Sequence, residues 1–271
     1  MINQYWVYYG IIPLAFLCIC CFSYSHKTKS NSINPDFTIT SHRGFSGEYP
    51  ENTLVAIEKA LELGVDRIEI DVHQTKDSVL VLMHDKSINR TTNGKGKVKD
   101  LTYAALQSFS AGITTNVDFV AEKIPTLSQV LDLVQGKSTL VIEIKEGHDY
   151  YPNIEQRIVD LVAQKRANEW CIIHSFKTEV LEKVHALDST LVLHQLLLST
   201  LLYDVAATPV YISELSVYHR AITAGVVDKV HQEQKKINAW TVNDTAKVQR
   251  LLQIGVDGII TDYPDLVQGL Q

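Results

Sequence analysis

Short apolar or alternating runs recur along the chain, and most are separated by segments with apolar residues at helical spacing. Runs of roughly four to eight residues predict strands, and apolar residues three and four positions apart predict amphipathic helices. Eight such strands are centred near residues 38, 69, 142, 173, 193, 215, 239 and 260. This order predicts a single-domain α/β fold, a (β/α)8 TIM-type barrel. A doubly wound open sheet is the alternative, but no Gly-rich phosphate loop follows the first strand.

Several predicted helices carry recognisable start and stop signals. Thr53 or Asn52 is a candidate N-cap for the first helix, and Gly64 follows its last turn. Thr126 and Asp244 are candidate N-caps of two later helices. Side-chain oxygens at an N-cap accept hydrogen bonds from free backbone N–H groups, and glycine favours the left-handed conformation that ends many helices.

One segment departs from the alternation of strand and helix. The polar residues 74–78 separate two apolar runs, and this connection is too short for a parallel crossover. We therefore predict a hairpin that leaves the barrel, turns at residues 76–78 and comes back to the barrel mouth. The returning strand would bring His84 near Asp71.

The strand before this turn, residues 67–73, alternates apolar residues with Glu69 and Asp71. Alternation places both carboxylates on one face of the strand. Inside a barrel they would repel each other and lose hydration unless a cation compensates. A pair of carboxylates on one strand face suits a hard divalent ion. An edge strand with a solvated acidic face is the alternative that this stretch alone leaves open.

In a barrel, further polar residues would meet these carboxylates at the carboxyl ends of the strands, where active sites of this fold lie. The full set is His42, Arg43, Glu69, Asp71, His84, Glu143, Lys145 and Trp240. Three carboxylates form an oxygen-rich site typical of Mg²⁺ or Ca²⁺, and arginine and lysine supply charge for an anionic group. Two histidines suit a proton donor and acceptor across a phosphodiester. No Ser or Cys is placed as a nucleophile, so phosphodiester cleavage fits better than acyl transfer.

Composition and charge exclude some functions and draw attention to the N-terminus. The chain has 271 residues, 45% of them hydrophobic, and a net charge of -6, so it lacks the overall basic field of a nucleic-acid-binding protein. Residues 1–25 contain no Lys, Arg, Asp or Glu, and residues 5–22 are almost wholly apolar. Three of the four cysteines lie in this segment, which leaves Cys171 as a predicted small buried residue.

The apolar N-terminus predicts a signal peptide or membrane anchor over residues 1–25, followed by a linker over 26–36 and the barrel domain over 37–271. We therefore expect an exported protein, periplasmic, cell-surface or secreted, with membrane association through residues 5–22 if the segment is retained. A cytoplasmic-facing anchor and a buried helix are the alternatives. The sequence makes no prediction of the oligomeric state.

Taken together, the motifs of the chain resemble those of the glycerophosphodiester phosphodiesterase family. They occur in family order over roughly residues 38–265. The motifs are His42-Arg43-Gly44, Pro50-Glu51-Asn52-Thr53, Glu69-Ile-Asp71-Val, Thr75-Lys-Asp, His84-Asp85, Arg90-Thr-Thr, Glu143-Ile-Lys145, Asn238-Ala-Trp240-Thr-Val-Asn243 and Gly255-Val-Asp-Gly-Ile-Ile-Thr-Asp-Tyr-Pro264. One departure is Ser78 in the hairpin turn, where the family often has glycine. The fifth and sixth strands match only loosely, which leaves the alcohol side of the substrate open.

The resemblance implies metal-dependent hydrolysis of glycerophosphodiesters to an alcohol and sn-glycerol 3-phosphate. The implied roles are as follows: Glu69, Asp71 and Glu143 bind Mg²⁺ or Ca²⁺, His42 and His84 are general acid and base, Arg43 and Lys145 bind phosphate, Trp240 lines the substrate pocket, and Glu51 and Asn52 orient their neighbours. A lysophospholipase D-type enzyme acting on lysophospholipids would use the same residues. A barrel that binds metal without catalysis is disfavoured, because both histidines and all three carboxylates are present.

Overall fold

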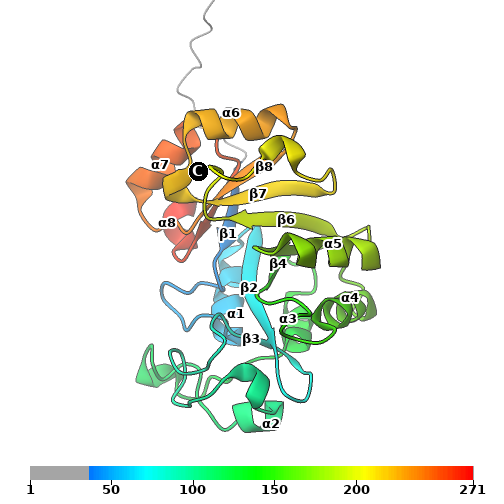
Figure 1. The fold of residues 1–271 in the computed structure, drawn as a ribbon. Coiled ribbons are helices and arrows are strands. Elements are labelled where there is room, and N and C mark those ends of the chain that lie inside the picture. The colour runs from blue at the N-terminus through cyan, green and yellow to red at the C-terminus, as the bar shows by residue number, and fades with distance from the viewer. Residues whose placement is uncertain (1–36, 271) are drawn as a thin grey trace, which may run out of the picture. The chain divides into compact units, whose positions relative to one another are not determined.

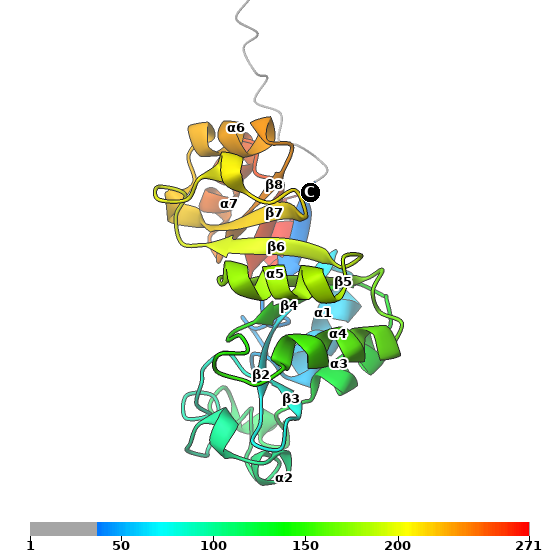
Figure 2. The same cartoon turned by 45° about the vertical axis from the view of Figure 1, so that its right-hand side comes forward.

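The computed structural model describes residues 37–270; the N-terminal segment predicted over 1–25 and the linker predicted over 26–36 lie outside the described residues. Within 37–270, eight parallel strands close into a barrel surrounded by helices (Figures 1 and 2). Around the barrel they are β1 (Thr38–Ser41), β2 (Arg67–Gln74), β4 (Thr139–Ile144), β5 (Cys171–Ser175), β6 (Val192–Leu197), β7 (Ile212–Tyr218), β8 (Lys236–Trp240) and β9 (Gly258–Thr261). Because β1 pairs with both β2 and β9, the barrel is closed and the predicted fold class is confirmed.

The helices follow the strands as the apolar spacing predicts. They are α1 (Leu54–Leu63), α3 (Leu127–Val134), α4 (Ile154–Gln164), α5 (Thr178–Leu187), α6 (Ala224–Gln232), α7 (Thr245–Gln253) and α8 (Pro264–Gln268). Thr53, Thr126 and Asp244 cap α1, α3 and α7 with their side chains, and Gly64 ends α1 at φ +75°. None of the helices in residues 37–270 is long and apolar enough to cross a membrane.

The predicted hairpin is present, and a long segment of short helical turns follows it before α3. Strand β3 (Leu80–Leu82) runs antiparallel to the end of β2, with Val72 opposite Leu82. The chain then continues through η1 (Val98–Asp100), α2 (Tyr103–Leu106) and η2 (Val117–Phe119), at the far side of the molecule from α6 (Figure 1). This segment has a small apolar core of its own around Ile88 and Leu106. Helix α2 in this segment has only four residues.

Alternation along the strands divides apolar from polar side chains. On β2, Ile68, Ile70 and Val72 are fully buried in the apolar layer beneath the helices. Glu69 and Asp71 lie between them in sequence, so they face the opposite side, the inside of the barrel. Cys171 is free and buried, as predicted.

A buried ion pair spans the interior near the amino-terminal ends of the strands. Arg67, the first residue of β2, donates two hydrogen bonds to Glu214 on β7, at 2.7 and 3.0 Å. Asn238 on β8 donates a third at 2.7 Å. The bonds from Arg67 connect opposite walls of the barrel, and the bond from Asn238 comes from the neighbouring strand.

Candidate active site

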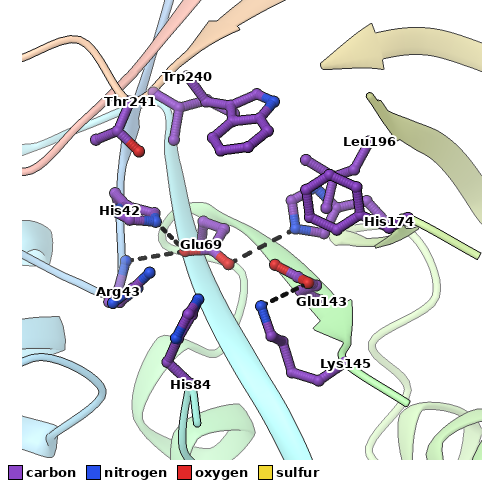
Figure 3. Close-up of a pocket in the computed structure, with 12 residues that line it drawn as sticks. His42, Arg43, Glu69, His84, Glu143, Lys145, His174, Leu196, Trp240 and Thr241 are labelled. Carbon is purple, nitrogen blue, oxygen red and sulfur yellow. Dashed lines mark hydrogen bonds and ion pairs between the residues drawn. The ribbon is translucent and has the colours of Figure 1, made fainter. Parts of the chain in front are cut away.

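A pocket opens at the carboxyl ends of the strands, where the barrel fold predicts it (Figure 3). Seven of the residues singled out in the sequence line it: His42, Arg43, Glu69, His84, Glu143, Lys145 and Trp240. Asp71, Glu51 and Asn52 do not line the pocket. Glu51 contacts Arg43, Asp71 contacts Lys145, and Asn52 contacts Asp71. The structure thus brings together residues from β1, β2, β4, β8 and the hairpin.

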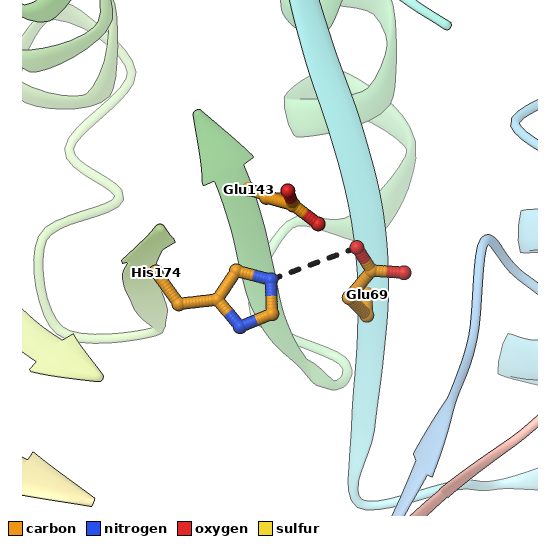
Figure 4. A group of neighbouring side chains, drawn as sticks. All are labelled: Glu69, Glu143 and His174. Atoms are coloured by element: carbon orange, nitrogen blue, oxygen red, sulfur yellow. Dashed lines mark ion pairs between the residues drawn. The ribbon is translucent and has the colours of Figure 1, made fainter. Parts of the chain in front are cut away.

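The acidic residues of the site come from neighbouring strands in fixed register. Asp71 on β2 lies opposite Glu143 on β4, which in turn lies opposite His174 on β5. One donor atom each from Glu69, Glu143 and His174 lies within 4.8 Å of the other two, and all three residues are buried (Figure 4). This group could hold a divalent metal ion.

His174 is not among the residues predicted from the sequence. Its Nε2 is 3.6 Å from Glu69 Oε1, and neither ring nitrogen has a hydrogen-bond partner among the described residues. A buried ring without partners suits a site that an ion or substrate completes. The signal was available, because His174 occupies the inward position of β5 beside Glu143, but it required the register between strands.

Asp71 is held by the cations of the site. Arg43 Nε is 3.2 Å from Oδ2, Lys145 Nζ is 3.5 Å from Oδ1, and Asn52 donates a hydrogen bond of 2.7 Å to Oδ2. Burial alone would raise the pKa of Asp71, but Lys145 and Arg43 hold it well below its usual range. Asp71 is therefore charged and fixes both cations, while its predicted role as a metal ligand stays a prediction.

Glu143 and Lys145 form an ion pair of 2.8 Å inside the pocket. Burial raises the pKa of Glu143 to about 7, although Lys145 opposes the shift. Burial would lower the pKa of Lys145, but Asp71 and Glu143 outweigh it and the pKa rises. A desolvated carboxylate of this kind gains from a further cation, so the donor set fits a divalent ion.

His42 follows β1 and is fixed by a carboxylate behind its ring. Its Nδ1 lies 2.6 Å from Asp262, which also accepts hydrogen bonds from Asn243 and Ser46. Burial would lower the pKa of His42, but the hydrogen bond to Asp262 and the charge of Glu69 raise it overall. The net shift is toward the protonated ring. Asp262 lies in a motif of the resemblance, but the sequence analysis predicts no role for it.

His84 reaches the pocket from the end of the hairpin, as predicted. The backbone N–H of Met83 donates to the Asp71 carbonyl at 3.0 Å, and His84 Nδ1 is 2.8 Å from Asp85. Burial lowers the pKa of His84, with Lys145 and Arg43 acting in the same direction against Asp71. The neutral form is favoured, opposite to His42.

Arg43 and Asn52 both adopt a left-handed backbone at φ +57°. This conformation lets the Arg43 N–H donate to Glu69 at 3.0 Å while its side chain reaches Glu51 at 2.9 Å. Asn52 also accepts a hydrogen bond from the Asp71 N–H at 3.0 Å. A strained backbone that places side chains in a polar site is typical of functional loops.

The other wall of the pocket is apolar. Trp240 donates its Nε1–H to the Ser216 carbonyl at 2.9 Å, and its ring packs against Phe176 with centroids 5.5 Å apart. Leu196 and Ile260 complete this wall. The pocket therefore has a charged side that suits phosphate and an aromatic side that suits the organic part of an ester.

A (β/α)8 barrel with two histidines, two cations and clustered carboxylates at its mouth defines the class of a phosphate ester hydrolase. A family model described as "Glycerophosphoryl diester phosphodiesterase family" matches residues 42–266. The chain belongs to this family and is a phosphoric diester hydrolase.

Relatives and solved structures agree with this assignment. A glycerophosphodiester phosphodiesterase of Bacillus altitudinis is 38% identical over 84% of this chain and 95% of its own length. One from Caldanaerobacter subterraneus subsp. tengcongensis is 37% identical over 86% and 96%. An Oleispira antarctica phosphodiesterase, solved with sn-glycerol-3-phosphate, matches with a TM-score of 0.76 over 86% of this chain and 95% of its own. At 24% identity, that structure supports the fold alone.

Proposed function

We propose that this protein hydrolyses glycerophosphodiesters to an alcohol and sn-glycerol 3-phosphate, in a reaction that depends on a divalent metal. The observation that carries the proposal is the pair of histidines with opposite pKa shifts in one pocket with Arg43 and Lys145. Titratable groups whose environments push their pKa values apart are the usual acid and base of an active site.

Arg43 and Lys145 bind the phosphate group. Both line the pocket, and both are already paired with buried carboxylates, so they are held in place before substrate arrives. The planar guanidinium of Arg43 can hold two phosphate oxygens, whereas Lys145 acts as a point charge.

Glu69 and Glu143, with His174 beside Glu69, would hold Mg²⁺ or Ca²⁺. Asp71 is assigned to the same site as a third carboxylate on the resemblance alone. Oxygen ligands favour these hard ions. When bound, such an ion supplies positive charge that stabilises the phosphoryl oxygens and can acidify a hydroxyl.

The two histidines divide the proton transfers. His84, neutral and in the pocket, accepts the proton of the hydroxyl that attacks phosphorus. His42, hydrogen-bonded to Asp262, donates a proton to the oxygen of the departing alcohol as the P–O bond breaks. The attacking hydroxyl belongs to the glycerol moiety, so this step leaves a cyclic phosphate. Water then opens the ring: its OH stays on phosphorus and its proton goes to the released glycerol oxygen, which gives glycerol 3-phosphate. Such general acid–base steps contribute roughly 10²–10⁴ in rate each.

The test is glycerol 3-phosphate release from glycerophosphocholine by the purified full chain. We expect thorough chelation to abolish turnover, because the carboxylates would be left without their counter-ion, and added Mg²⁺ or Ca²⁺ to restore it. Unchanged activity after chelation would refute the metal assignment. Metal binding without turnover of any phosphodiester would favour the non-catalytic barrel.

A lysophospholipase D-type activity is the second candidate, and one observation favours it. Leu198, Leu201 and Leu202 lie in the loop after β6, two to six residues beyond Leu196 of the pocket wall, and are 66%, 87% and 99% exposed. The loop that follows this wall thus exposes apolar side chains. Choline release from lysophosphatidylcholine, with little turnover of glycerophosphocholine, would favour the lipid substrate.

Export of the protein, with membrane association through residues 5–22, remains our proposal for its location. It is supported by the uncharged, apolar composition of that segment. Accessibility of a C-terminal tag to protease added to intact cells tests it.

A further inference from the structure

Arg90 lies in the segment after the hairpin and connects two carboxylates near the pocket. Its NH1 and NH2 donate to Glu51 at 2.7 and 2.8 Å. Its Nε and NH2 donate to Asp85 at 2.8 and 3.1 Å. Arg90 therefore forms a bidentate pair with each carboxylate at once, which only a planar guanidinium can do.

The two carboxylates differ in how firmly the rest of the protein holds them. Glu51 has a side chain 18% exposed and accepts a further hydrogen bond from Arg43 at 2.9 Å. Arg43 is itself 16% exposed and paired with the fully buried Asp71. Glu51 is thus half-buried and held in place through Arg43 and Asp71.

Asp85 and His84, by contrast, stand at the edge of the pocket. Their side chains are 31% and 34% exposed, and Asp85 contacts His84 Nδ1 at 2.8 Å. Among the described residues, only the side chains of His84 and Arg90 hydrogen-bond to Asp85. The orientation of the His84 ring therefore depends on Asp85, and that of Asp85 depends on Arg90.

We propose that Arg90 is a positioning residue that fixes the acid–base His84 through Asp85, by tying Asp85 to the Glu51–Arg43 pair, which the fully buried Asp71 holds in place. The inference rests on the proposed function, since it assigns His84 a proton transfer. A reacting group displaced by about 1 Å can lose roughly 100-fold in rate, so a distant tether can matter to the chemistry.

The first test is Arg90→Ala in the full chain, with glycerophosphocholine as substrate. We expect kcat to fall about 10–100-fold, as for other residues that orient a reacting group. KM should change by less than about threefold, because Arg43 keeps Glu51 and Asp71 as partners. Arg250→Ala, which removes an exposed arginine from α7, is the matched control and should leave kcat unchanged.

If Arg90 only held its own segment in place, its loss would also slow the enzyme. A second comparison separates this structural role from the proposed positioning of His84. In a His84→Ala background, Arg90→Ala should cost less than about threefold, since the group that it positions is gone. A loss of the same factor in both backgrounds would overturn the proposal, as would an Arg90→Ala enzyme of normal rate.

Chemical rescue gives a third, independent readout. Arg90 is 47% exposed, so its site is open to small cations. We expect millimolar guanidinium chloride to restore part of the kcat of Arg90→Ala, while equal NaCl or ammonium chloride does not. Arg90→Lys should remain slow, because an ammonium cannot bind both carboxylates bidentately. Full activity of Arg90→Lys would contradict the proposal.

Failure of this proposal is distinguishable from failure of the proposed function. An active wild type with an equally active Arg90→Ala variant removes Arg90 from the mechanism and leaves the function standing. A wild type that turns over no glycerophosphodiester overturns the proposed function, and the role of Arg90 with it.

Discussion

The pKa of each histidine in this site depends on its burial and on the charged groups around it. The two histidines are the same residue type, yet Asp262 and Glu69 raise the pKa of His42 against its burial, and burial lowers the pKa of His84. Near neutral pH one ring is poised to give a proton and the other to accept one. This difference predicts which of the two histidine variants regains activity when the leaving group needs no proton.

We expect His42→Ala and His84→Ala each to lower kcat by roughly 10²–10⁴ on glycerophosphocholine without unfolding the protein. With a p-nitrophenyl phosphodiester, whose leaving group needs no proton, His42→Ala should recover most of its loss, and His84→Ala should not. Steady-state kinetics with both substrates measure this, and circular dichroism checks the fold.

His231→Ala serves as the control, since that histidine pairs with Asp257 before β9, at the other end of the barrel. It should retain normal kcat on both substrates. Equal recovery of the two pocket variants on the activated substrate would contradict the division into acid and base. A near-normal rate for either variant would remove that residue from the mechanism.

Alternation along one strand was enough to predict that Glu69 and Asp71 share a face, and the predicted barrel placed that face inward. Partners across strands were not predictable in the same way. His174 is recognisable only from its register with Glu143. Asp262 meets His42 because β9 lies beside β1, which depends on closure of the barrel.

Among the elements, the hairpin between β2 and β3 positions His84, and its turn has a residue under strain. Ser78 has φ +65°, in the left-handed region that favours glycine. We expect Ser78→Gly to stabilise the protein by about 0.5–1 kcal/mol, because the left-handed conformation costs other residues roughly 1–2 kcal/mol and glycine loses part of this gain as chain entropy. Urea unfolding measures the difference.

The same substitution in a helix is the control. Ser128 lies within α3, so Ser128→Gly should destabilise the protein by roughly 0.5 kcal/mol. If Ser78→Gly also lowers the free energy of unfolding, the Ser78 side chain stabilises the protein by more than its left-handed backbone conformation destabilises it. Activity should be unchanged in both variants, since neither side chain lines the pocket.

Caps and turns at the ends of elements were predictable because they depend on neighbouring residues alone. Thr53, Thr126 and Asp244 all cap as expected. The path of the segment after the hairpin was not predictable in this way. Its residues pack against one another in a separate small core, so its irregular path depends on contacts that local sequence does not specify.

For the whole molecule, the order of strands and helices predicted the barrel. It did not predict the ion pair inside the barrel near the amino-terminal ends of the strands. Glu214 and Arg67 come from strands on opposite walls, 147 residues apart in sequence. Burial would raise the pKa of Glu214, but hydrogen bonds from Arg67, with the charges of His194 and Arg67, lower it to about 2. The ionised pair therefore contributes to the stability of the closed barrel.

This contribution gives the stability of the barrel a defined pH dependence. Because the pKa of Glu214 is lower in the folded chain than its ordinary value of 4.5, the stabilisation is present above pH 4.5 and is lost as the pH falls toward 2. At pH 7, Glu214→Gln should lower the free energy of unfolding by roughly 3–5 kcal/mol, since it leaves Arg67 buried without its partner charge. Between pH 4.5 and 2 the wild type should approach the variant.

Urea unfolding of both proteins at pH 7, 4.5 and 3 measures this convergence. Glu169→Gln, at an exposed position, is the matched control and should leave the free energy of unfolding nearly unchanged at each pH. A constant gap between wild type and Glu214→Gln across the acid range would mean that the pair contributes through shape and hydrogen bonding rather than through its charge. A gap that closes would mean that protonation of Glu214 removes the stabilisation that its charge gives the barrel at the end opposite the active site.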